Sequence, residues 1–219
     1  MKAIEGFNGQ YRFLSNFYPL QPGHIRMWDE LFQTAEHFYQ AEKFRHTSRE
    51  YWQKVIDAST PGKAKKLANE GEGLGYVKSD FSKQKIQWMG FTLSKKFDLD
   101  NRVDPNLAIM LMATGEVDLI ELNNWDDRFW GKVLNKETGE SEGRNVLGKL
   151  LMKRRDTLNS LFEEMCFAKW LSTSPLLRHQ FFKDSVRAEF KVLFEVASRS
   201  LDIDIPNDFQ GIKNERHIS

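Results

Sequence analysis

The segment from Leu31 to Phe44 carries the best-placed chemistry in this sequence. If it forms a helix, Glu36, Gln40 and Lys43 stand at i, i+4 and i+7 and line one stripe, while aromatic residues occupy much of the rest. Thr34 is a good N-cap, so Glu36 falls in the first turn, where the helix dipole favours an ionised carboxylate. Such a carboxylate suits stabilising a cationic transition state or activating a water. The alternative is that Glu36 only complements the dipole while Gln40 and Lys43 are solvated.

A second acidic segment runs from Asn124 to Gly131. It interleaves Asp126 and Asp127 with the indoles of Trp125 and Trp130. Acidic groups among aromatic rings suit a site that stacks a planar base and orients a water or a hydroxyl. The alternative is an aromatic cluster under a charged loop.

A third segment, 143–152, predicts an anion site at a helix N-terminus. Asn145 can cap the helix and Gly148 permits close backbone approach, so that Arg144 and Lys149 can meet a phosphate. Basic residues continue at Lys153, Arg154 and Arg155, with no acid between 144 and 155. This cluster is the best candidate for a local contact with nucleic acid or pyrophosphate. The alternatives are an ordinary capped helix and a solvated face.

The elements that must position these residues are mainly helical, because the aromatic residues follow helical spacing rather than strict alternation. We expect helices at about 34–45, 48–57, 61–70, 79–95, 105–113 and 145–164. The first 30 residues are punctuated by Gly and Pro, and there Ala3–Phe7, Tyr11–Phe13 and His24–Trp28 are expected to pair as small strands. The polar segment between Gly131 and Gly143 predicts an excursion or mobile loop.

Beyond about residue 156 the character of the sequence changes. Residues 160–171 and 176–200 predict two helices, followed by a polar tail from Pro206. The predicted fold is thus mainly α: one multihelical domain, residues 1–160, with a few short N-terminal strands and a C-terminal helical extension, residues 161–219. The extension has no assigned role, although a dimerisation or partner-binding element is one interpretation.

The composition limits the classes of function that are open to this chain. The 219 residues are 40% hydrophobic, and 32 Lys and Arg balance 31 Asp and Glu, which argues against nucleic-acid binding through whole-surface charge. The N-terminus lacks the apolar run of a signal peptide, and the longest apolar stretch, Leu107–Ala113, is too short for a membrane span. With one cysteine, Cys166, the chain forms no internal disulfide, and we expect a cytoplasmic protein.

No cofactor or metal signature is present in the sequence. There is no Walker loop, no GxGxxG and no HExxH, since Phe38-Tyr39-Gln40 follows Glu36-His37. The five histidines are scattered, so neither a metal nor a cofactor is expected.

Taken in order, these segments resemble the NADAR (YbiA-like) family over about residues 5–158. The matching motifs are Phe13-Leu14-Ser15-Asn16-Phe17-Tyr18-Pro19, the segment from Phe32 to Phe44, Ala113-Thr114-Gly115, Glu121, Asp127-Arg128-Phe129-Trp130-Gly131, Gly143-Arg144-Asn145-Val146-Leu147-Gly148 and Leu151-Met152. The chain departs from the family pattern at Phe81, Val133 and Ser141-Glu142, which bears on loop geometry and leaving-group selectivity.

The resemblance implies a mainly helical, metal-independent N-glycosidase acting on ribosides. By motif match it places the family's essential Glu, Lys, Asp and Trp at Glu36, Lys43, Asp127 and Trp130. Glu36 would stabilise an oxocarbenium-like transition state or act as base, and Asp127 would orient the water or ribose hydroxyls. Lys43 would hold Glu36 or a substrate oxygen, and Trp130 would stack on the base. The remaining expected substrate-binding residues are Asn16, Gln40, Gly131, Arg144, Asn145, Gly148 and Lys149.

Two substrates are consistent with this resemblance: ADP-ribosylated guanine, free or in nucleic acid, and phosphorylated ribosylamino-pyrimidine intermediates of riboflavin synthesis. The cluster from Lys149 to Arg155, together with Lys63, Lys65 and Lys66, favours the first. A rival of another class is a non-catalytic ADP-ribose binding module, against which the presence of both Glu36 and Asp127 argues.

Overall fold

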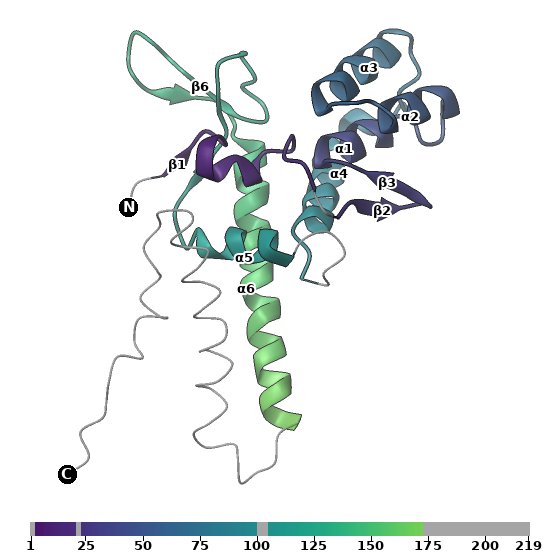
Figure 1. Cartoon of the computed structure of the whole chain (residues 1–219). Coiled ribbons are helices and arrows are strands. Elements are labelled where there is room, and N and C mark those ends of the chain that lie inside the picture. The colour runs from purple at the N-terminus through teal and green to yellow at the C-terminus, as the bar shows by residue number, and fades with distance from the viewer. Residues whose placement is uncertain (1–2, 21–22, 100–104, 173–219) are drawn as a thin grey trace, which may run out of the picture.

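Helices dominate the fold, as predicted. The computed structural model describes residues 3–20, 23–99 and 105–172. The helices are a 3-10 helix η1 (Gly9–Leu14), α1 (Ala35–Glu42), α2 (Arg49–Ile56), α3 (Pro61–Gly73), α4 (Phe81–Lys96), α5 (Pro105–Ala113) and α6 (Val146–Ser172). In Figure 1, α6 is a long rod crossed by α5, and α1, α2 and α3 gather at one side of it.

Local capping explains where three helices begin. The side chains of Thr34, Ser48 and Thr60 each accept a hydrogen bond from a backbone N–H in the first turn of α1, α2 and α3. Pro61 occupies the first turn of α3, where the missing N–H costs little. Relative to expectation, α1 ends earlier, at Glu42, and α3 continues to Gly73.

Short strands connect distant segments. β1 (Ile4–Glu5) pairs in parallel with β4 (Leu119–Ile120), and β2 (Ile25–Met27) pairs antiparallel with β3 (Glu30–Phe32). The strands predicted near Ile4 and Ile25 are therefore confirmed, but the strand expected at Tyr11–Phe13 is wrong. Those residues lie in η1, where the consecutive side chains Phe13 and Leu14 are both buried, which an alternating strand does not allow.

The segment between Gly131 and Gly143, predicted as an excursion or mobile loop, forms a β hairpin. β6 (Lys132–Leu134) pairs antiparallel with β7 (Ser141–Glu142) and in parallel with β5 (Leu122–Asn123). Its turn is ordered by Asn135, whose side-chain oxygen accepts the N–H groups of Glu137 and Thr138. Asx-type turns of this kind leave no hydrophobic period in the sequence.

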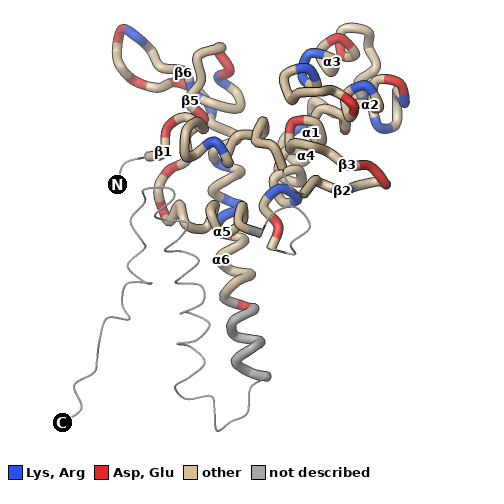
Figure 2. The backbone as a smooth tube through the Cα atoms, viewed as in Figure 1, with Lys and Arg blue, Asp and Glu red and all other residues tan. Residues whose placement is uncertain are grey.

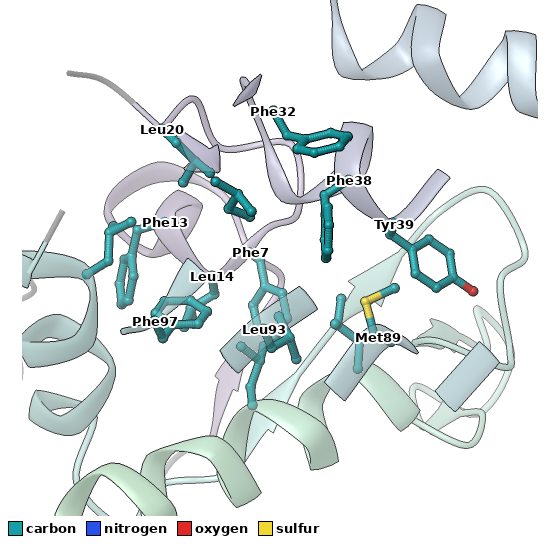
Figure 3. Close-up of a cluster of buried hydrophobic side chains, with 14 of the residues drawn as sticks. Phe7, Phe13, Leu14, Leu20, Phe32, Phe38, Tyr39, Met89, Leu93 and Phe97 are labelled. Carbon is teal, nitrogen blue, oxygen red and sulfur yellow. The ribbon is translucent and has the colours of Figure 1, made fainter. Parts of the chain in front are cut away.

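The core is built largely of aromatic side chains. Phe13 meets Phe97 edge-on at 6.5 Å between ring centroids, and Phe32 meets Phe38 at 5.0 Å (Figure 3). Because α1 packs against α2, α3 and α4, its residues are enclosed from all sides. This enclosure removes the predicted solvated face from α1.

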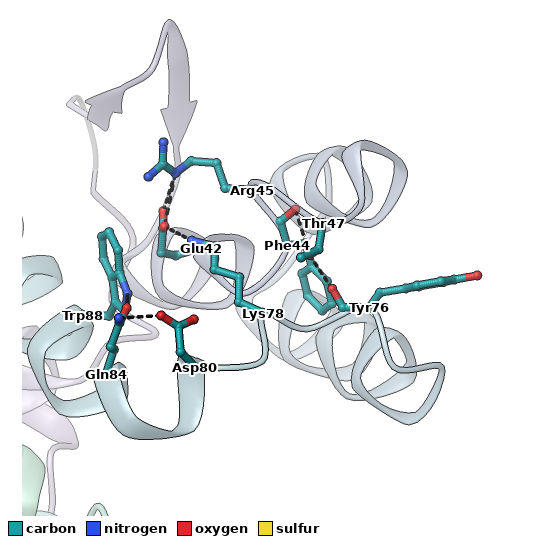
Figure 4. A network of polar contacts seen from close by, with 9 residues as sticks. All are labelled: Glu42, Phe44, Arg45, Thr47, Tyr76, Lys78, Asp80, Gln84 and Trp88. Atoms are coloured by element: carbon teal, nitrogen blue, oxygen red, sulfur yellow. Dashed lines mark hydrogen bonds and ion pairs between the residues drawn. The ribbon is translucent and has the colours of Figure 1, made fainter.

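A buried carboxylate joins α1 to the segment before α4. Glu42 accepts from Arg45 Nε at 3.1 Å and forms an ion pair with Lys78 (Figure 4). The backbone N–H of Lys78 donates to the carbonyl of Lys43, which fixes the same junction. Sequence reasoning did not select Glu42, and its paired environment fits a structural role.

One continuous helix replaces the two predicted between 145 and 171, since α6 runs through residue 160 without a break. The division at residue 160 stays a prediction. The helix expected at 176–200 and the tail from Pro206 lie outside the described residues. No helix in the described part of the chain is both long and apolar enough to cross a membrane.

Candidate active site

The first turn of α1 places Glu36 in the protein interior. Thr34 Oγ1 accepts the backbone N–H of His37 at 3.2 Å, and the N–H of Glu36 donates to the carbonyl of Asn16 at 3.0 Å. The His37 ring is held between the Thr34 hydroxyl and the carbonyl of Ala58, at 2.8 and 2.9 Å. Burial lowers the pKa of His37, with the bond to Ala58 opposing. His37 is therefore a neutral structural residue that fixes the start of α1.

Glu36 is a buried carboxyl group with one side-chain hydrogen-bond donor among the described residues. Only 6% of the residue is exposed, and Oε1 accepts from Gln40 Nε2 at 2.8 Å. Burial raises the pKa of Glu36, and the Asp127 charge adds to this, while Gln40, Lys65 and Lys43 oppose it. The expectation that the helix dipole would set its ionisation is wrong, because desolvation dominates.

Gln40 and Lys43 share the buried stripe with Glu36, so the solvated interpretation of this face is wrong. Lys43 Nζ forms an ion pair with Glu72 of α3 at 3.1 Å, and its positive charge acts on Glu36 from there. The spacing did bring the three polar groups together. The direct partner of Lys43 is nonetheless a carboxylate on α3 that the sequence did not indicate.

Asp127 shapes the second half of the site. Its Oδ1 accepts the backbone N–H groups of Phe129 and Trp130, at 3.1 and 2.8 Å, and its own N–H donates to Asn123 Oδ1 at 3.0 Å. These bonds form a tight turn that presents Trp130. The Trp130 ring meets Tyr39 of α1 edge-on, at 5.8 Å between centroids. This contact brings the 124–131 loop against α1, as the proposed chemistry requires.

A comparison with known proteins shows the family of the chain. The NADAR domain profile matches residues 6–159. This chain belongs to the NADAR family.

Several curated proteins are relatives of this NADAR chain. A riboflavin biosynthesis protein of Vibrio vulnificus is 34% identical over 146 residues, which cover 67% of this chain and 35% of that protein. An N-glycosidase of Nostoc punctiforme is 32% identical over 152 residues, covering 69% of this chain and 88% of the relative. N-glycosidase YbiA of Escherichia coli is 28% identical over 134 residues, covering 61% and 75%.

The chain spans only about a third of the Vibrio relative, and 23% of the chloroplastic riboflavin biosynthesis protein PYRR of Zea mays. For the fold, the NMR structure of E. coli YbiA aligns with a TM-score of 0.54 and 24% sequence identity, over 83% of this chain and 94% of that one. The mainly helical NADAR fold is thereby shown.

The glycine and asparagine residues of the family motifs pack the backbone in this structure. Asn145 has φ of 50°, its Oδ1 accepts the N–H of Glu121 at 3.0 Å, and its Nδ2 donates to the carbonyl of Leu119 at 2.8 Å. A Cβ at Gly148 would lie 2.0 Å from that Leu119 oxygen. The substrate-binding roles expected for Asn145 and Gly148 stay predictions, and the structure gives both an architectural role.

The basic stretch divides into two groups. Arg144, Lys149 and Lys153 are exposed. Arg154 donates from Nε to the carbonyl of Phe97 at 2.9 Å, and the buried Arg155 donates to Thr114 Oγ1 and to the carbonyl of Val117, both at 2.9 Å. These two arginines join α6 to the ends of α4 and α5, so their assignment to a surface contact is wrong.

On α2 and α3 the basic residues are mixed with acidic ones along the chain. Figure 2 shows basic and acidic positions intermixed on α2 and α3, where Lys63, Lys65 and Lys66 lie. Near the 124–131 loop, Lys85 and Arg144 both lie over the Phe129 ring, at 3.6 and 4.7 Å from its centroid. Lys85 was not predicted, because only the fold brings α4 to this loop.

The sequence assigned no role to Tyr39 or to Glu121. Burial raises the pKa of the Tyr39 hydroxyl, and the charges of Glu36, Glu72 and Asp127 add to this effect. Tyr39 is therefore a neutral phenol near acidic groups.

For metal binding, no group of three His, Cys, Asp or Glu side chains suited to hold an ion occurs among the described residues.

Proposed function

We propose that this NADAR protein is an N-glycosidase that hydrolyses the bond between ribose C1′ and a nitrogen of a base. The observation that carries the proposal is the enclosed carboxyl of Glu36, whose pKa is raised by burial and by the charge of Asp127. A carboxylate whose pKa is raised is a stronger base than an ordinary carboxylate, which suits a general base. In its ionised form it also stabilises the positive charge that develops at C1′.

Unused acceptors beside Glu36 support a hydroxyl-bearing ligand. Asn16 Oδ1 and Gln40 Oε1 are buried and have no hydrogen-bond partner in the described part of the chain. Buried polar atoms are nearly always paired, so these two oxygens suit donors supplied by a ligand. The hydroxyl groups of a ribose meet that requirement. Trp130, fixed by the Asp127 turn, would stack on the base.

The first candidate substrate is ADP-ribosylated guanine. Arg144, Lys149 and Lys85 supply exposed or ring-stacked cations near the loop that could meet its phosphates. The structural roles of Arg154 and Arg155 reduce the basic surface on which this preference rested. A phosphorylated ribosylamino-pyrimidine is the second candidate, favoured by the names of the Vibrio and maize relatives.

Product analysis by mass spectrometry separates these proposals. The protein is incubated in parallel with ADP-ribosylated guanosine and with a ribosylamino-pyrimidine phosphate. Release of guanosine and ADP-ribose supports the first substrate, and release of the pyrimidine with ribose phosphate supports the second. If neither substrate is cleaved but ADP-ribose binds by calorimetry, the non-catalytic binding module replaces the glycosidase proposal.

A further inference from the structure

Residues from two separate segments of the chain, 131–132 and Asn145, converge on the backbone of Glu121, between β4 and β5. Its N–H donates to Asn145 Oδ1 at 3.0 Å, and its carbonyl accepts the N–H of Lys132 at 2.8 Å. A Cβ at Gly131 would lie 2.2 Å from the Glu121 carbonyl oxygen and 3.1 Å from Glu121 Cγ. The fold therefore holds Glu121 in one position and keeps the space beside it free of a side chain.

The Glu121 side chain lies beside the loop that carries Trp130, since a Cβ at Gly131 would be 3.1 Å from Glu121 Cγ. The negative charge of Asp127 and the positive charge of Lys65 act on the carboxyl groups of both Glu121 and Glu36. Glu121 Oε2 is buried and has no hydrogen-bond partner among the described residues. A buried oxygen without a partner, next to a proposed substrate site, suits a contact with the ligand.

We propose that Glu121 is the general acid of this site, an inference that rests on the proposed N-glycosidase function. The Glu121 O–H gives its proton to the leaving nitrogen while the C1′–N bond breaks and its electron pair passes to that nitrogen. A water oxygen then bonds to C1′, and the Glu36 carboxylate takes the proton that this water loses. Afterwards Glu36 releases one proton to solvent and Glu121 regains one, so the cycle balances as a hydrolysis.

The electrostatic surroundings supply the protonated form that this role needs. Burial and the Asp127 charge raise the pKa of Glu121 to about 7, while Lys96 of α4 and Lys65 of α3 oppose the shift. Lys96 is fully buried, donates to the carbonyl of Ser15 at 2.6 Å, and has its pKa lowered by burial to about 7. A purely structural alternative makes Glu121 the charge partner of Lys96.

The test compares Glu121→Gln with Glu5→Gln. Glu5 lies exposed on β1 and pairs with Ile120, the residue that precedes Glu121. The control therefore makes the same chemical change close to Glu121 but on the surface. The pH profile of kcat is measured on whichever of the two ribosyl substrates the wild type cleaves. We expect Glu121→Gln to lower kcat at least about 100-fold with little change in KM, and to remove the fall in activity above pH about 7. Glu5→Gln should retain both limbs of the profile.

The outcomes distinguish three cases. If the wild type cleaves neither substrate, the proposed function fails. If it cleaves one and Glu121→Gln keeps wild-type kcat or the same alkaline limb, Glu121 is not the acid and the limb belongs to another group such as Lys96. If Glu121→Gln does not fold, Lys65→Gln provides the test, because removing that cation raises the pKa of Glu121 and moves the alkaline limb to higher pH. Lys63→Gln is the control, because Lys63 donates to the Ser59 hydroxyl and its charge does not shift the pKa of Glu121. Equal pH profiles for the two lysine variants would overturn the inference.

Discussion

Gly131→Ala is expected to destabilise the protein because the site is packed around this glycine. The new Cβ would lie 2.2 Å from the carbonyl oxygen of Glu121 and 2.6 Å from Asn123 Nδ2. Ordinary carbon–oxygen contacts are at least about 3.3 Å, so the backbone must move by about 1 Å. That movement weakens the Lys132 bond to Glu121 and the two bonds from Asn123 Nδ2, which hold the loop.

The size of the effect follows from those contacts. Overpacking costs about 1–3 kcal/mol, and partial weakening of the three hydrogen bonds together adds about 1 kcal/mol, so we expect a loss of about 2–4 kcal/mol. For a domain of this size that corresponds to a Tm lower by roughly 5–15 °C. Thermal unfolding followed by circular dichroism measures it, with denaturant titration as a second estimate.

Gly90→Ala is the matched control. Gly90 lies inside α4, where a Cβ would meet only Leu150 Cδ2 at 3.8 Å, an ordinary contact. Alanine there should stabilise the helix by about 0.5–1 kcal/mol. A Tm of Gly131→Ala within about 2 °C of the wild-type Tm corresponds to a loss of less than about 1 kcal/mol. In that case the close approach around Glu121 is not required and the packing argument is refuted.

Four further predictions concern the chemistry and the basic residues. Glu36→Gln should lower kcat at least about 100-fold while calorimetry shows ligand affinity within a few-fold, and wild-type turnover would remove Glu36 from the mechanism. Activity should survive exhaustive chelation with EDTA, because no group of three metal-binding side chains converges among the described residues; a loss that one divalent metal restores would contradict this. Arg155→Gln should cost about 2–4 kcal/mol of stability measured by denaturant titration, since two buried bonds are lost, whereas Lys149→Gln with Lys153→Gln should leave stability unchanged. If that lysine pair contacts nucleic acid, its removal weakens cleavage of an ADP-ribosylated oligonucleotide and reduces the salt slope by about 0.9 per contact, and equal effects on a free nucleoside would argue against the contact.

Local signals predicted the helices well because capping and helical spacing are properties of neighbouring residues. Thr34 is the clearest example, since its side chain caps α1 as expected. The prediction of a strand at Tyr11–Phe13 failed because the burial of consecutive side chains in η1 depends on the segments that pack around it. For Arg155 a signal did exist: it falls on the stripe of Leu151 and Leu158, all three buried, so helical spacing placed it in the interior while its charge suggested the surface.

Glu121 was beyond sequence reasoning for a different reason. Its environment is made by Lys65, Lys96 and Asp127, which come from α3, α4 and the 124–131 loop. No spacing along the chain encodes the meeting of these elements. The resemblance to the family included Glu121 in its motif but supplied no role for it, and the surroundings given by the fold are what suggest one.

Glu36 shows how two opposing effects decide the chemistry of the site. A charge in the first helical turn gains about 0.3–1 kcal/mol from the dipole, which alone would lower the pKa. Burying a carboxylate costs several kcal/mol unless donors replace its water, and Gln40 supplies one such donor here. Burial therefore wins, the pKa rises, and Glu36 holds a proton more tightly than an ordinary carboxylate does. Since Glu36 must be ionised to act as base and Glu121 must be protonated to act as acid, activity should rise with pH through the pKa of Glu36 and fall above about 7.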